Sequence, residues 1–253
     1  MKESLFYWGL ILSFLCVLCS PVAATEPAVG DELLIQGLFK EAIAAYEEEL
    51  KTTNDPAPVY NNLAAAHYQD GNIAQARHYF QLAAEAAPAN GMPWINLGML
   101  SELEGDLGAA KANYLRATSS AEPAIAANGH INVAMVLLQE EDIQGAINAL
   151  NAALAKIEAE TAPEYQELRT EIYDQIGYIY ASIGDNEAAF DAFAAATQTG
   201  TKSPIPWLYL GAFLETAGMN DQALLMYQEA ITRDVDNVTL AQEAYDTLRA
   251  QSS

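Results

Sequence analysis

The sequence predicts an all-helical fold built from repeated helical hairpins. Apolar residues recur at spacings of three and four, which is the period of a helix that buries one face. Glycines stand between these segments, where they can end a helix. No stretch alternates apolar and polar residues for long enough to form a strand. The chain has 253 residues, of which 51% are hydrophobic and 18% charged, so it can bury a sizeable core.

The first residues form a separate element. An apolar run at residues 5–18 follows Lys2 and is too short for a comfortable membrane span. Pro21 and several small residues come next, as at the cleavage site of an export signal. We therefore expect residues 1–24 to be a signal peptide, and the chain to be periplasmic or secreted. An uncleaved membrane anchor is the alternative, because Glu3 offsets the charge of Lys2.

Both cysteines lie inside this segment, at Cys16 and Cys19. Cleavage would remove them, so we expect a mature chain with neither a thiol nor a disulfide. Cys19 could instead carry the lipid of a bacterial lipoprotein, although Leu18 stands where such signals have a small residue. We expect contact with a membrane only if the segment is retained or lipidated.

The rest of the chain repeats itself with a period near 34 residues. The predicted units lie near residues 25–56, 57–90, 91–124, 127–160, 170–203 and 204–237. The opening helix of the first unit is expected to be short. Residues 238–250 have no partner unit, so we expect them to form a terminal capping helix.

Three columns of the repeat predict close helix packing. The second helix of each unit has an invariant alanine: Ala42, Ala76, Ala110, Ala146, Ala189 and Ala223. Four residues later stands a large apolar residue: Tyr46, Phe80, Tyr114, Leu150, Phe193 and Tyr227. The first helix has a small residue: Gly30, Ala64, Gly98, Ala134, Gly177 and Gly211. These glycines are expected to serve packing and not phosphate binding.

Two departures from the repeat carry expectations of their own. Glu141 replaces the glycine of the turn in the fourth unit, so we expect that turn to close without a residue at positive φ. Extra residues separate the fourth and fifth units around Pro163. We expect them to lengthen two helices that project beyond the stack.

The pattern resembles the tetratricopeptide repeat. The nearest matches are WINLG at 94–98 with Ala110 and Tyr114, and WLYLG at 207–211 with Ala223 and Tyr227. The resemblance covers about nine tenths of the chain and implies a right-handed superhelix of six hairpins plus the capping helix. It also implies that the first helices line an inner groove. The matching residues are those that stack helices, so they are specific for the fold and not for a function.

One column of the predicted groove is polar. Asn62, Asn96 and Asn132 stand at the same position of three successive units, and Gln175 follows in the next. An amide both donates and accepts hydrogen bonds, as an extended peptide backbone requires. Tetratricopeptide proteins that hold extended peptides use a similar asparagine ladder, so the resemblance implies this role for the three asparagines, with Gln175 as a further candidate. The alternative is that each amide bonds to a neighbouring helix.

An apolar strip is expected beside the amides. It comprises Met92, Ile95, Met99, Leu103, Ile131, Met135 and Leu138. Exposed, it would form a patch large enough for a partner, and methionine adapts to varied side chains. The alternative is that the capping helix or another subunit covers it.

The net charge of −23 indicates the kind of partner. It disfavours nucleic acid and anionic lipid. Family members that grip acidic carboxyl termini need Lys or Arg in the groove, and none stands at the groove positions of this chain. We therefore expect a neutral or basic protein or peptide, although the acidity could also serve solubility alone.

The sequence predicts neither an enzyme nor a cofactor or metal site. Its three histidines, His67, His78 and His130, have no metal-site spacing and no nucleophile beside them. The leading prediction is an exported adaptor that holds an extended segment of a partner in a cell-envelope assembly. The alternative is a structural subunit of an envelope complex, which could be a homo-oligomer, with its groove filled by self-association or by its own tail. An accessory subunit of an envelope enzyme is a third possibility.

Overall fold

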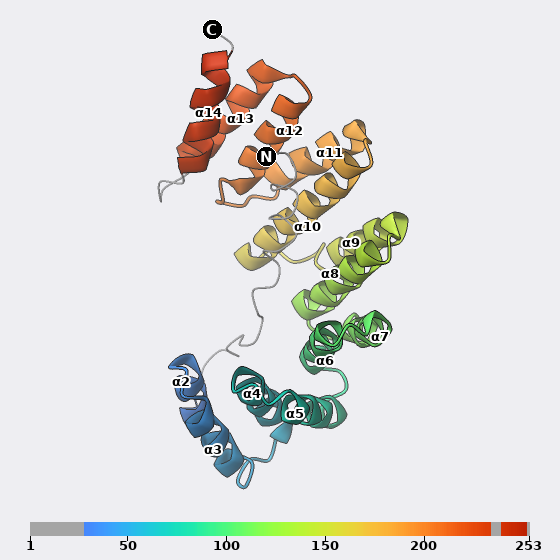
Figure 1. The fold of residues 1–253 in the computed structure, drawn as a ribbon, viewed down its shortest axis with the longest axis vertical. Helices are drawn as coiled ribbons and strands as arrows, with labels where there is room; N and C mark the ends of the chain where they lie inside the picture. The colour runs from blue at the N-terminus through green and yellow to red at the C-terminus, as the bar shows by residue number, and fades with distance from the viewer. Residues whose placement is uncertain (1–27, 234–238, 252–253) are drawn as a thin grey trace. The chain divides into compact units, whose positions relative to one another are not determined.

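The computed structural model describes residues 28–233 and 239–251 (Figure 1). Within these ranges every regular element is a helix, which confirms the all-helical prediction. The helices are α2 (Val29–Ile35), α3 (Phe39–Glu49), α4 (Pro56–Gln69), α5 (Ile73–Ala86), α6 (Met92–Leu103), α7 (Leu107–Ala117), α8 (Pro123–Gln139), α9 (Ile143–Lys156), α10 (Pro163–Ser182), α11 (Asn186–Thr197), α12 (Ile205–Thr216), α13 (Asn220–Arg233) and α14 (Thr239–Gln251).

The described chain divides into two compact units, residues 28–156 and residues 157–251. The first unit contains the hairpins α2–α3, α4–α5, α6–α7 and α8–α9, each packed on the next. The second contains the hairpins α10–α11 and α12–α13, followed by α14. Six hairpins and a final helix are therefore present, as the repeat predicts.

Glycine in the first helix lets the ring of the second helix come close. A Cβ atom added to Gly98 would lie 2.4 Å from Cε1 of Tyr114. The same addition at Gly177 would lie 2.7 Å from the ring of Phe193. Contacts this short do not occur between real side chains, so these positions exclude even alanine without a shift of the ring. The prediction that these glycines serve packing is confirmed.

The turn inside the fourth hairpin differs from our expectation. Glu141 itself adopts a positive φ of 62°, close to the 81° of Gly105 in the preceding hairpin. The amides of Glu141 and Asp142 donate to the carbonyls of Leu138 and Leu137, at 3.1 and 2.8 Å. These bonds satisfy the end of α8 and offset the strain of a left-handed glutamate. The expectation of a turn without positive φ is wrong.

The extra residues between the fourth and fifth hairpins lengthen one helix and not two. α9 has 14 residues, as α5 does, whereas α10 has 20. The added turns of α10 pack against the loop after α11: the hydroxyls of Thr170 and Thr199 lie 2.5 Å apart. A projecting pair of helices is therefore not found, because the fold uses this surface for contacts within residues 157–251.

The final helix covers the end of the last hairpin. Leu248 of α14 is buried in a cluster with Leu210, Leu214 and Tyr227. Ala241 contacts Trp207 in a second cluster. This confirms the capping helix, since the apolar surface of α12 and α13 would otherwise face water.

The predicted signal peptide, residues 1–24, lies outside the described residues. Among the helices that the structure describes, none has the length and apolar character that a membrane crossing requires.

Candidate peptide-binding face

The first helices of successive hairpins form a layer of their own. α6 packs directly on α8, and in the other unit α10 packs on α12, although a second helix separates them in sequence. We call α2, α4, α6 and α8 the first-helix layer of residues 28–156. Residues at the predicted groove positions lie on these helices, so the layer brings them together.

A line of hydrogen bonds joins three helices of this layer. Asn96 of α6 donates its amide to the side-chain oxygen of Asn61 on α4, at 3.1 Å. Asn61 lies 3.5 Å from the oxygen of Asn62, which donates to Asp31 of α2 at 3.1 Å. The hydroxyl of Tyr46 donates to the same carboxylate, at 2.6 Å. Asn61 and Asp31, which sequence reasoning did not single out, are the partners of the predicted amides Asn96 and Asn62.

The three predicted asparagines differ in exposure. Asn96 is only 3% exposed, whereas Asn62 and Asn132 are half-buried. For Asn62 and Asn96 the amide hydrogens already point to neighbouring helices, which is the alternative raised by the sequence. Their role in holding a peptide stays a prediction.

Gln175 belongs to the other unit. It lies on α10, where its amide nitrogen donates to Glu171 at 3.3 Å. Its side-chain oxygen is buried and has no donor among the described residues.

The predicted apolar strip is divided by burial. Ile95 and Ile131 are buried as part of the core, and Leu103 is 63% exposed. The remaining members are half-buried: Met92, Met99, Met135 and Leu138. The half-buried side chains leave partial apolar surface beside the amides, so the strip is not one open patch.

Acidic side chains of the first helices are anchored by tyrosines. The hydroxyl of Tyr114 donates to Glu102, at 2.5 Å, and that carboxylate also accepts from Gln139 of α8, at 2.9 Å. Tyr227 donates to Glu215 in the same way, at 2.7 Å. Burial, and then the bond to the carboxylate, raises the pKa of both tyrosines well above its ordinary value.

A signal for these bonds is present in the sequence but was not used. Where the second helix has tyrosine at 114 or 227, glutamate stands twelve residues earlier. Where that helix has Phe80, Leu150 or Phe193, the earlier position holds Tyr68, Leu138 or Ala181. In these five hairpins a hydroxyl therefore occurs together with a carboxylate twelve residues earlier, whereas in the first hairpin Tyr46 donates to Asp31, 15 residues earlier.

Asp174 is a second feature that sequence reasoning missed. This α10 residue is 6% exposed, and its Oδ1 has no hydrogen-bond partner among the described residues. Burial, and then the charge of Glu171, raises the pKa of Asp174 to about 8. In the free chain its carboxyl group is therefore mostly protonated at neutral pH.

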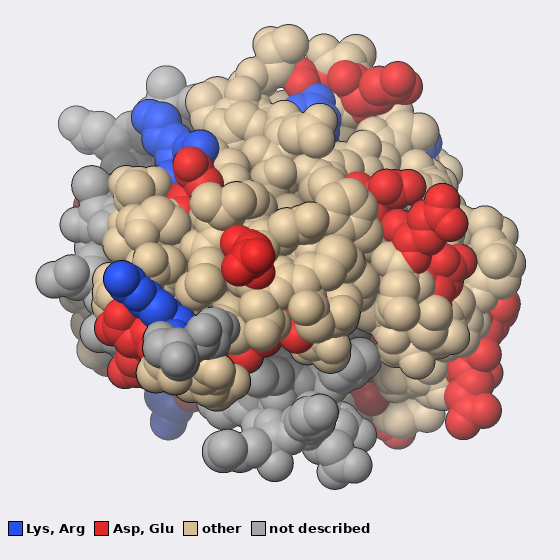
Figure 2. Space-filling model, turned by 90° about the horizontal axis from the view of Figure 1, so that it is seen from above, with Lys and Arg blue, Asp and Glu red and all other residues tan. Residues whose placement is uncertain are grey.

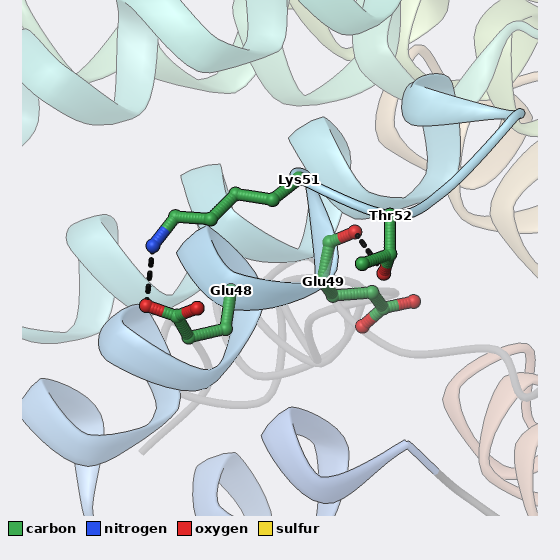
Figure 3. Close-up of polar contacts among 4 residues, drawn as sticks. All are labelled: Glu48, Glu49, Lys51 and Thr52. Carbon is green, nitrogen blue, oxygen red and sulfur yellow. Dashed lines mark hydrogen bonds and ion pairs between the residues drawn. The ribbon is translucent and has the colours of Figure 1, made fainter.

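Several basic side chains are already engaged within the chain. Lys51 contacts Glu48 at the end of α3, where the hydroxyl of Thr52 also donates to the carbonyl of Glu49 at 3.2 Å (Figure 3). Lys111 pairs with Glu140, and Arg233 lies 3.5 Å from Glu229. Arg169 donates to backbone carbonyls of residues 157 and 160.

The surface that remains is acidic. The chain contains 34 acidic and 11 basic residues. Acidic side chains are spread over the face shown in Figure 2, with fewer basic ones among them. A partner that approaches this surface meets a negative field.

Two of the three histidines, His67 and His130, are partly buried, whereas His78 is exposed. The ring of His67 stacks on Tyr79, with centroids 5.4 Å apart, and burial lowers its pKa. Burial also lowers the pKa of His130. Within residues 28–233 and 239–251, no three His, Cys, Asp or Glu side chains gather as a metal site would require.

Comparisons with known proteins agree on the fold. A family model described as tetratricopeptide repeat matches residues 57–90, 93–123 and 170–198. No curated protein sequence matches the chain. Of the similar solved structures, one is the APC/C hetero-tetramer Cut9-Hcn1, with 17% identity over 87% of this chain and a TM-score of 0.57. This chain spans 41% of that one, which is less than half its length.

Two further structures are matched over most of their own length. YrrB, described as a TPR protein with an unusual peptide-binding site, shares 19% identity, with 81% of this chain and 99% of that one covered and a TM-score of 0.51. The C-terminal part of a TPR repeat-containing protein from Cytophaga hutchinsonii shares 13% identity, with 88% of each chain covered and a TM-score of 0.61. At such identities the likeness shows a common fold.

Proposed function

We propose that this chain, which is a tetratricopeptide repeat protein, holds an extended segment of a partner protein along its first-helix layer. Repeats of this family form scaffolds for protein–protein interaction and are typically adaptors without catalytic activity. The observation that supports the proposal best is the line of amides on α4 and α6, continued by Asn132 on α8. The predicted export signal adds that the partner belongs to a cell-envelope assembly, in the periplasm or outside the cell.

The spacing of the layer suits an extended peptide. Packed helices lie about 8–10 Å apart, and an extended chain rises about 3.3 Å per residue. The asparagine side chains of successive first helices can therefore hydrogen-bond to about every third residue of the peptide. Backbone groups supply these bonds whatever the peptide sequence, so the ladder provides affinity and the neighbouring side chains provide selectivity.

Binding exchanges hydrogen bonds within the layer for bonds to the peptide. Asn62 and Asn96 donate to neighbouring side chains in the free chain, which holds their rotamers in place. For Asn96 this exchanges one neutral hydrogen bond for another, which changes the free energy little. Rotamers that are already fixed lower the entropy cost of binding. The half-buried Met99 and Met135 then cover apolar side chains of the peptide.

The charge of the chain favours a neutral or basic partner. Basic residues such as Lys51 and Lys111 are paired with glutamates. Because the chain has 34 acidic and only 11 basic residues, most acidic groups have no basic partner. An acidic segment would be repelled, and a basic one would associate faster at low salt.

The test replaces Asn62, Asn96 and Asn132 together by alanine. We expect this variant to lose capture of a partner from native envelope extract while its helical circular dichroism is kept. A matched variant replaces Asn113, Asn148 and Asn151, which lie on second helices, and should capture as well as the parent chain. Equal capture by both variants would refute the proposal. A change of oligomer size in sedimentation, without a change in capture, would favour the structural-subunit alternative.

A further inference from the structure

Asp174 is a buried carboxylate for which the described part of the fold supplies too few donors. It is 6% exposed, and its Oδ1 has no partner among the described residues. A buried ion without compensation is strongly unfavourable, and buried polar atoms in native proteins nearly always have a partner. The residue therefore needs an explanation beyond packing.

The repeat shows that packing does not require this carboxylate. Asp174 occupies the repeat position held by Asn61 in the second hairpin, Ile95 in the third, Ile131 in the fourth and Leu208 in the sixth. Both isoleucines are buried. An apolar side chain can thus pack at this position of the hairpin. A buried aspartate is less favourable there than an apolar residue. Such conflicts are typical of functional sites.

The groups around Asp174 are rich in acceptors and aromatic rings. Gln175, next in sequence, has a buried side-chain oxygen that also lacks a donor among the described residues. Glu171 lies one turn earlier, and Tyr178 one turn later. Tyr209 of α12 places its ring 5.1 Å from that of Tyr178, at 71°. We call these five residues, Asp174 included, the acidic–aromatic site; all of them lie within residues 157–251.

We propose that the acidic–aromatic site binds the cationic side chain of a lysine or arginine of a partner protein. Once Asp174 is ionised, both unpartnered atoms are acceptors, so an occupant of the ionised site must bring several donors. Lysine brings three and arginine five, and neither has a side-chain acceptor. A neutral donor would leave the carboxylate charge uncompensated, whereas a cation balances it and is also attracted to the faces of tyrosine rings. This inference rests on the proposed function and adds the chemistry of the bound partner.

Binding at this site should release a proton. Burial raises the pKa of Asp174 to about 8, so the free site carries a proton on this carboxyl near neutral pH. The titratable groups that interact with it are Glu171 and Tyr178 on α10 and Tyr209 on α12. α11 contributes the apolar ring of Phe193, 5.2 Å from Tyr178. As the pH increases toward 8, the affinity for a cationic side chain should increase by up to about tenfold per pH unit. Above pH 8 the affinity should level off.

The experiment selects binders from a random dodecapeptide library displayed on phage, with the full chain as target. We expect the selected peptides to share a lysine or arginine at one fixed position. In synthetic copies, replacement of an arginine there by neutral citrulline should weaken binding to the parent chain at least tenfold. With the Asp174→Asn variant, replacement of the peptide arginine by citrulline should change the affinity little. The pH dependence of the affinity should also disappear in this variant. Asp191→Asn, at an exposed position of α11, is the matched control and should behave as the parent chain.

Three results would overturn the site. The selected peptides could lack a fixed basic residue, or Asp174→Asn could keep the full citrulline effect. Alternatively, Asp174→Asn could change the oligomer size with no effect on peptides, which would identify a second copy of the chain as the occupant.

A second measurement separates this inference from the proposed function. Methylguanidinium is titrated into the chain while the carboxyl carbon resonance of Asp174 is followed. If the library yields no binders but methylguanidinium lowers the pKa of Asp174, the peptide-binding function fails and the cation site stands. If neither peptides nor methylguanidinium affect Asp174, the site is refuted.

Discussion

Glu141 adopts the left-handed conformation that glycine adopts in the equivalent turns of other hairpins. Its φ is 62°, against 83° for Gly71 and 81° for Gly105. A left-handed conformation costs a residue with a side chain about 1–2 kcal/mol relative to glycine. Glu141→Gly should therefore raise the free energy of unfolding by about 1 kcal/mol in urea titrations. The reverse change Gly105→Glu should lower it by a similar amount; a loss of stability in Glu141→Gly would show that the side chain makes a contact that matters.

The buried carboxyl of Asp174 should make stability depend on pH. Its pKa is about 8 in the folded chain, above the ordinary value of 3.8, so the folded state binds the proton more tightly. Stability from this group is complete below pH 4 and is lost as the pH rises toward 8. The advantage of Asp174→Asn over the parent chain should grow between pH 4 and pH 8, by at most about 1.4 kcal/mol per pH unit. A constant difference across this range would show that Asp174 titrates normally.

At the scale of the hairpin, the contact between glycine and ring sets how closely two helices approach. A Cβ on Gly98 would meet the ring of Tyr114 at 2.4 Å, whereas a Cβ on Gly108 meets only Asp106, at 3.5 Å. We expect Gly98→Ala to destabilise the chain by about 1–3 kcal/mol, because the ring must leave its position. Gly108→Ala should be neutral or stabilising, by up to about 1 kcal/mol. Equal effects in thermal unfolding would mean that the ring moves without cost.

The helices were predictable because packing and pattern agree in each hairpin. The alanine column, the ring column and the small residues of the first helix recur in six units, and the hairpins follow from them. The length of α10 and the turn at Glu141 were predicted wrongly. The length of α10 depends on contacts that sequence spacing does not contain, such as the packing of Thr170 on Thr199. The turn after α8 is closed by the same pair of backbone bonds as the glycine turn after α6, and this geometry places Glu141 at positive φ.

The candidate site was only partly predictable, for a related reason. The position of Asn62, Asn96 and Asn132 follows from the repeat, but their partners depend on which side chains of neighbouring helices come within reach. Asp174 was missed, although it is a charged residue at a position that holds Asn61, Ile95, Ile131 and Leu208 in other hairpins.

At the scale of the whole molecule, one pattern runs through both units while the polar features differ between them. Residues 28–156 carry the line of amides, and residues 157–251 carry the acidic–aromatic site. In the proposed function the line of amides provides bonds to any extended backbone, and the acidic–aromatic site selects a basic side chain. The net charge of −23 acts over the entire surface and favours the same class of partner.

The most direct measurement follows the side-chain amide resonances of asparagine in the ¹⁵N-labelled chain while a selected dodecapeptide is added. We predict that the signals of Asn62, Asn96 and Asn132 shift together and saturate with the peptide, while those of Asn113 and Asn148 on second helices stay in place. Shifts confined to Asn113 and Asn148 would contradict the proposed function, because the peptide would then lie on the second helices.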